Sequence, residues 1–74
     1  MSDDLIDARG LLCPLPVLRL RKRMSKLASG EQIILWADDP AAAIDVPHFC
    51  AESGHVLVET GTLEDGQTYT IKKK

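Results

Sequence analysis

The 74-residue sequence has few of the residues on which several common kinds of binding and catalytic site depend. It has one phenylalanine, one tryptophan and one tyrosine, too few for the stacking surface of a single-stranded nucleic-acid binder. Its two cysteines are too few for a scaffold built on disulfides. No apolar run approaches the roughly 20 residues that a membrane span requires. These absences exclude a disulfide-rich scaffold and a membrane span, and they disfavour a base-stacking surface.

The short length also limits what the chain can enclose. A chain of this size buries only about 60% of the surface that its unfolded form exposes, so it cannot surround a nucleotide cofactor and keep a core. We therefore expect one domain over residues 1–74 whose chemistry lies on its surface. Residues 1–7 have neither the basic start nor the apolar run of a signal peptide, which predicts a cytoplasmic protein with reduced thiols.

The net charge of -2 conceals an uneven distribution along the chain. No acidic residue lies between Asp7 and Glu31, and all 11 acidic residues lie outside that stretch. We expect the three lysines at residues 72–74 to form a solvated tail. The stretch without acidic residues contains Cys13, and its six basic residues are Arg9, Arg19, Arg21, Lys22, Arg23 and Lys26.

The hydrophobic periodicity predicts two helices and four strands in the order βαβαββ. Strands are expected over residues 5–8, 31–37, 56–60 and 67–72. The first helix begins at residues 13–14 and carries an apolar stripe at Val17, Leu20, Met24 and Leu27. Pro47 predicts an irregular first turn over residues 40–44 in the second helix, with a regular segment over 45–53. The expected fold is an α/β two-layer sandwich, a four-stranded mixed sheet with two helices packed on one face.

The start of the first helix is the most informative segment. With Cys13 as the N-cap, Pro14 and Pro16 fall in the first turn, where missing N–H groups cost little. The same register pairs Leu12 with Val17 in a hydrophobic staple. We therefore expect Cys13 to sit at a rigid helix start.

That position has consequences for the thiol. The partial positive charge at a helix N-terminus favours a thiolate, and the Leu15 amide is available to point at the sulfur. Arg9 and the basic helix add a favourable field. We therefore predict that the pKa of Cys13 lies below the free value of about 8.5. The alternative interpretation is that Cys13 only caps the helix while the prolines shape a turn.

Four segments resemble the TusA/SirA family of small sulfur-carrier proteins. They are D-A-R-G-L-L-C-P-L-P at residues 7–16, W-A-D-D-P at 36–40, D-V-P-H-F-C at 45–50 and S-G-H at 53–55. The Cys-Pro-x-Pro motif of the family is matched by Cys13, Pro14, Leu15 and Pro16. The resemblance implies a βαβαββ sandwich in which Cys13 holds sulfane sulfur as a persulfide. It also implies a donor such as a cysteine desulfurase or rhodanese, an acceptor protein cysteine, and a role in tRNA thiolation or sulfur metabolism.

Persulfide relay is thiol exchange, so neither a metal nor another cofactor is expected. We expect a monomeric carrier rather than a freestanding enzyme, and one exposed sulfur that two different partner proteins approach. The residues predicted to contact partners are Arg9, Leu18, Arg21, Lys22 and Asp39; the alternative for each is a solvated side chain. For Asp39, capping of the second helix is the simpler role.

Two other classes of function stay open at this point. One is a redox or regulatory protein in which Cys13 forms a disulfide, with Cys50 as one partner, although Cys50 is expected to pack in the core. The other is an RNA-binding module, which the overall acidity and the few aromatics disfavour, so direct nucleic-acid contact is not expected. His48, Cys50 and His55 lack a paired Cys-x-x-Cys, so no zinc site is expected. We expect His48 to be exposed and His55 to make a structural hydrogen bond.

Overall fold

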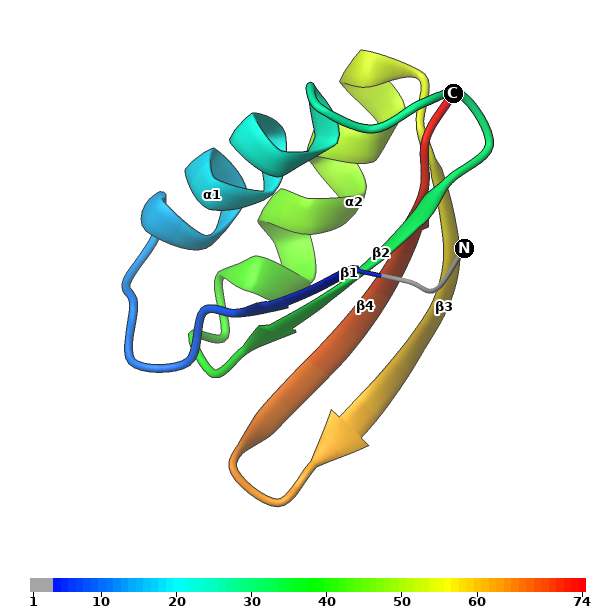
Figure 1. The fold of residues 1–74 in the computed structure, drawn as a ribbon. Coiled ribbons are helices and arrows are strands. Elements are labelled where there is room, and N and C mark those ends of the chain that lie inside the picture. Colours follow the sequence, from blue (N-terminus) through cyan, green and yellow to red (C-terminus); the bar gives the residue numbers. More distant parts are fainter. Residues whose placement is uncertain (1–3) are drawn as a thin grey trace.

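The computed structural model describes residues 4–74, and its elements follow the predicted order βαβαββ. The sheet has the strand order β1-β2-β4-β3, with β1 parallel to β2 and the other pairs antiparallel. Both helices lie on the same face of the sheet (Figure 1), which confirms the predicted two-layer sandwich. The elements are β1 (Asp4–Asp7), α1 (Leu15–Met24), β2 (Gln32–Ala37), α2 (Ala42–Ser53), β3 (Val56–Leu63) and β4 (Gly66–Lys72).

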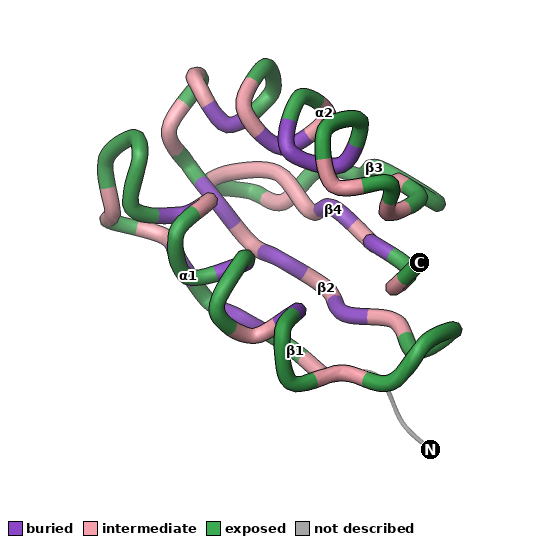
Figure 2. Tube along the Cα trace, turned by 90° about the horizontal axis from the view of Figure 1, so that it is seen from above, coloured by how far each residue is buried: buried purple, intermediate pink, exposed green. Residues whose placement is uncertain are grey.

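The core lies between the helices and the sheet. Burial alternates along β2, where Ile33, Leu35 and Ala37 are fully buried and the residues between them are only partly buried (Figure 2). The apolar stripe predicted for the first helix supplies buried Leu20 and Met24 from the other layer, whereas its last member, Leu27, lies beyond the end of α1 and is only partly buried. Every second residue of β2 and one face of α1 therefore pack together in one core. Over residues 4–74, neither helix is long and apolar enough to cross a membrane. We expected no signal peptide in residues 1–7, and residues 1–3 of that segment lie outside the described range.

The prediction that Cys13 caps α1 is wrong by one residue. The N-cap is Pro14, and α1 begins at Leu15. The predicted staple is also absent, because the Leu12 side chain is 72% exposed. The Leu15 amide donates to the Leu12 carbonyl oxygen at 2.8 Å, so it does not point at the sulfur of Cys13. The prolines still occupy the helix start, as the sequence predicted.

The start of α2 is irregular, as Pro47 led us to expect. The amides of residues 42–44 donate to carbonyl oxygens three residues earlier, and the Asp45 amide makes the first bond of α-helical spacing, to Ala41 at 2.9 Å. The helix nevertheless begins at Ala42 rather than at residue 45, and Pro47 lies inside it without ending it. Gly54 ends the helix in the left-handed conformation that glycine adopts readily.

The C-terminal lysines do not form the solvated tail that we expected. Lys72 is the last residue of β4, and the Lys73 amide donates to the Glu31 carbonyl oxygen at 2.7 Å. The Lys74 amide donates to His55 Nδ1 at 3.1 Å, which confirms the structural hydrogen bond predicted for that histidine. The tail prediction failed because backbone pairing continues past the end of the last strand.

Candidate active site

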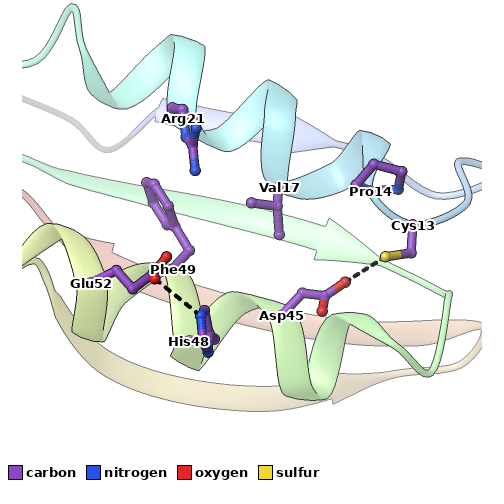
Figure 3. A pocket seen from close by; sticks show the side chains of 8 residues that line it. All are labelled: Cys13, Pro14, Val17, Arg21, Asp45, His48, Phe49 and Glu52. Carbon is purple, nitrogen blue, oxygen red and sulfur yellow. Dashed lines mark hydrogen bonds and ion pairs between the residues drawn. The ribbon is translucent and has the colours of Figure 1, made fainter.

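Cys13 is exposed and its thiol is free. It lies in the segment between β1 and α1, and its peptide bond to Pro14 is cis. The sulfur sits at one end of a groove of about 200 Å³ between the two helices (Figure 3). The groove is lined by Cys13, Pro14 and Val17, by Arg21 on α1, and by Asp45, His48, Phe49 and Glu52 on α2.

Two aspartates hold Cys13 from the side of α2. The Cys13 amide donates to Asp39 Oδ2 at 2.7 Å, and its thiol donates to Asp45 Oδ2 at 2.6 Å. Asp39 does not cap α2 as expected, because the N-cap is Ala41 and no side chain caps the helix. Asp39 instead accepts from the Ala41 amide at 3.0 Å in the turn before the helix, so one carboxylate holds both that turn and the backbone of Cys13. The hydrogen bonds from the Ala41 and Cys13 amides lower the pKa of Asp39. Asp39 thus joins the segment that contains Cys13 to the turn before α2.

The two carboxylates shift the pKa of the Cys13 thiol in the direction opposite to our prediction. The hydrogen bond to Asp45 raises the pKa of Cys13 above its ordinary value, and partial desolvation and the charges of Asp45 and Asp39 act in the same direction. The prediction of a lowered pKa is therefore wrong. It assumed that the helix terminus dominated, whereas a carboxylate in direct contact with the sulfur is the stronger influence.

Arg9 does not supply the free positive charge expected near Cys13. Its guanidinium pairs with Asp7 at 2.8 Å and with Asp65 at 3.2 Å, and it stacks 4.8 Å from the ring centroid of Trp36. The contact with Arg9 lowers the pKa of Asp7 to about 2. Arg9 therefore ties the segment before Cys13 to the β3–β4 turn, and two carboxylates compensate its charge.

The predicted partner-contact residues of α1 fall in different places. Leu18 is 48% exposed, and Arg21 forms part of the groove wall, with its guanidinium carbon 5.6 Å from the ring centroid of Phe49. Lys22 is exposed in a second hollow together with other basic residues of the α1 segment and with Ile6 of β1. The structure thus brings Arg21 to the groove that holds Cys13 and places Lys22 elsewhere.

Sequence reasoning missed the contribution of α2 to the groove. Asp45, His48, Phe49 and Glu52 follow the spacing i, i+3, i+4, i+7, so they share one face of the helix. This spacing was the available signal. His48 is exposed, as expected, and its Nε2 lies 3.3 Å from Glu52 Oε2.

Cys50 packs in the core, as the sequence predicted, with only 3% of its surface exposed. Burial raises the pKa of its thiol. A buried, protonated thiol is a poor nucleophile, which disfavours a disulfide between Cys50 and Cys13. Among residues 4–74, no group of three histidine, cysteine, aspartate or glutamate side chains is placed to hold a metal ion.

Two comparisons bear on this site. A family model described as "Sulfurtransferase TusA" matches residues 5–73. The fold is similar to the crystal structure of a SirA-like protein from Desulfitobacterium hafniense, with a TM-score of 0.76 and 24% sequence identity over 92% of this chain and 93% of that chain. The family match spans Cys13 and every residue of the groove.

Proposed function

Because the chain belongs to the TusA sulfurtransferase family, we propose that Cys13 carries sulfane sulfur as a persulfide between two partner proteins. The donor is of the cysteine desulfurase or rhodanese type, and the acceptor is a cysteine of a second protein. The observation that carries this proposal is an exposed, free thiol at the end of an open groove. Two different protein surfaces can approach a sulfur in this position.

The chemistry is two successive thiol exchanges. The Cys13 thiolate attacks the outer sulfur of the donor persulfide, a new S–S bond forms, and the donor cysteine leaves as a thiolate. An acceptor thiolate then attacks the outer sulfur on Cys13, and the Cys13 thiolate leaves. One sulfur atom moves at each step with no net oxidation, so the exchange consumes no further redox reagent.

We assign the docking of partners to the α1 surface next to the groove. Leu18 offers an exposed apolar contact, and Arg21 offers positive charge at the groove to an acidic partner surface. Lys22 lies in the second hollow, so it would meet only a partner that extends past the groove along α1. Asp39 and Arg9 act indirectly, since one holds the Cys13 backbone and the other braces the segment before it. The carrier serves tRNA thiolation or sulfur metabolism in the cytoplasm as a monomer, through protein partners and without binding the nucleic acid itself.

The test uses a cysteine desulfurase supplied with cysteine that carries radioactive sulfur. Wild type and Cys50→Ala should each take up about one labelled sulfur per chain, because Cys50 lies in the core and does not meet the donor. Cys13→Ala should remain unlabelled, and treatment with a small thiol should remove the label from the other two proteins. Equal labelling of Cys13→Ala, or none of the wild type, would contradict the proposal.

A further inference from the structure

The contact between Asp45 and Cys13 is unusual for a thiol that has to react. The thiol donates to Asp45 Oδ2 at 2.6 Å, and Asp45 points from the first turn of α2 toward the sulfur (Figure 3). The Asp45 side chain makes no other hydrogen bond or ion pair with residues 4–74. Within residues 4–74, the Cys13 thiol is therefore the one hydrogen-bond partner of this carboxylate.

No cation within the described part of the chain forms an ion pair with that carboxylate. Arg9 is paired with two other aspartates, and His48 faces Glu52. Arg21 lines the same groove but stacks on Phe49.

A second negative charge lies beside Cys13. Asp39 holds the Cys13 amide at 2.7 Å, so a second carboxylate lies beside the carrier residue. Its charge and that of Asp45 both oppose ionisation of the thiol, and the pKa of Cys13 is raised. The isolated protein thus favours the protonated form.

Sulfur transfer has the opposite requirement. Cys13 must be a thiolate when it attacks the donor persulfide, and it must leave as a thiolate when the acceptor takes the sulfur. A thiolate of lower pKa is both more abundant at neutral pH and a better leaving group. A chemical group of the partner must therefore weaken the hydrogen bond between Asp45 and the Cys13 thiol.

We propose that Asp45 is a positioning residue that keeps the free carrier unreactive, and that each partner releases it with a basic side chain placed beside the reacting cysteine. The inference rests on the proposed function. The incoming cation pairs with the Asp45 carboxylate and removes the acceptor of the S–H bond. The thiol proton passes to water, Cys13 binds the outer sulfur, and the donor's leaving thiolate takes up a proton from water.

The shape and charge of the groove match such a partner segment. Val17 and Phe49 give the groove an apolar surface, and Asp45 lies at the end that holds Cys13. A partner loop that carries an apolar residue and a lysine or arginine beside its cysteine complements this arrangement. The same contact would assist uptake and discharge, because both steps need the Cys13 thiolate.

The first experiment measures the reactivity of the free carrier toward iodoacetamide at neutral pH, with Cys13 followed by peptide mass spectrometry. For each tenfold gain in thiolate fraction, the rate should rise about three- to fourfold, since nucleophilicity falls as the pKa falls. We expect Asp45→Asn to react at least about threefold faster than wild type. Glu64→Gln is the matched control, because it removes one carboxylate charge from the exposed turn between β3 and β4, away from the groove, and its rate should not change.

The pH dependence of Cys13 alkylation in the wild type tests the same inhibition without relying on a variant. The rate of Cys13 alkylation should reach half its maximum at a higher pH in the folded protein than in a peptide of residues 7–16. A half-maximum at or below that of the peptide, or an Asp45→Asn rate equal to or below that of the wild type, would overturn the inhibitory role of Asp45.

The second experiment measures sulfur uptake from a cysteine desulfurase. Although its thiol is more reactive, Asp45→Asn should show a KM about two- to fivefold higher, since one ion pair with the donor is lost. Its KM should also depend less on salt than that of the wild type. An unchanged KM and an unchanged salt dependence would refute the claim that a basic side chain of the partner pairs with Asp45. Wild type that accepts no sulfur would instead refute the proposed function, and the alkylation rates would still decide what Asp45 does.

Discussion

Replacing Gly66 by alanine tests the packing that supports the site. Its backbone is not in the left-handed region, so alanine suits the chain conformation and would by itself stabilise the protein by about 0.4–1 kcal/mol. A Cβ atom at this position, however, would lie 2.5 Å from the Ala37 carbonyl oxygen and 3.3 Å from the Asp38 Cα atom. The end of β2 would have to move, and overpacking of this kind costs about 1–3 kcal/mol. We therefore expect Gly66→Ala to lower the free energy of unfolding.

Urea unfolding, followed by circular dichroism, shows directly whether Gly66→Ala raises or lowers the free energy of unfolding. A domain of this length has a free energy of unfolding of about 4–11 kcal/mol, so the expected loss is well within reach of the assay. Gly61→Ala is the matched control, because its Cβ would meet only the Thr68 hydroxyl, at 2.7 Å, and that side chain can rotate away. Gly66→Ala that is as stable as the wild type, or more stable, would refute the reasoning.

Two further predictions concern charged residues. Asp7→Asn should destabilise the protein above pH 4, and the difference from wild type should shrink below pH 4 and disappear as the pH falls through about 2. The reason is that the folded pKa of Asp7 is about 2 against an ordinary 3.8, so its stabilisation is lost as it protonates; urea unfolding at several pH values checks this, and a difference independent of pH would count against it. Arg21→Glu should slow sulfur uptake from a desulfurase and weaken its salt dependence, because it reverses a charge in the groove wall. Uptake kinetics identical to wild type at low and high salt would show that Arg21 is not a partner contact.

The fold could be predicted from the sequence because its signals are local. The helical stripe that includes Leu20 and Met24 and the apolar run of β2 placed the main core elements correctly. The break signals at Gly54 and Pro47 placed the end of α2 and its irregular start. Each of these signals depends on the conformational preferences of a few neighbouring residues.

The protonation of Cys13 could not be predicted in the same way, because it depends on contacts between distant parts of the chain. Asp39 and Asp45 lie 26 and 32 positions after Cys13. The pairing of β2 with β1 brings Asp39 to Cys13, and the packing of α2 beside α1 brings Asp45 to it. Arg9 likewise finds Asp65, which is 56 positions away. Reasoning from sequence neighbours assigned the basic stretch to the thiol, whereas in the fold the nearest charges are carboxylates.

The central claim is that Cys13 holds transferable sulfur, and intact-mass spectrometry after incubation with a desulfurase and cysteine tests it most directly. Wild type should gain the mass of one sulfur atom, and a small thiol should return it to its starting mass with release of sulfide. This second step is essential because oxidation to a sulfinic acid adds nearly the same mass but is not reversed by thiols. Cys13→Ala should gain nothing. A mass gain in Cys13→Ala equal to that of the wild type, or a gain in the wild type that the thiol does not reverse, would contradict the account.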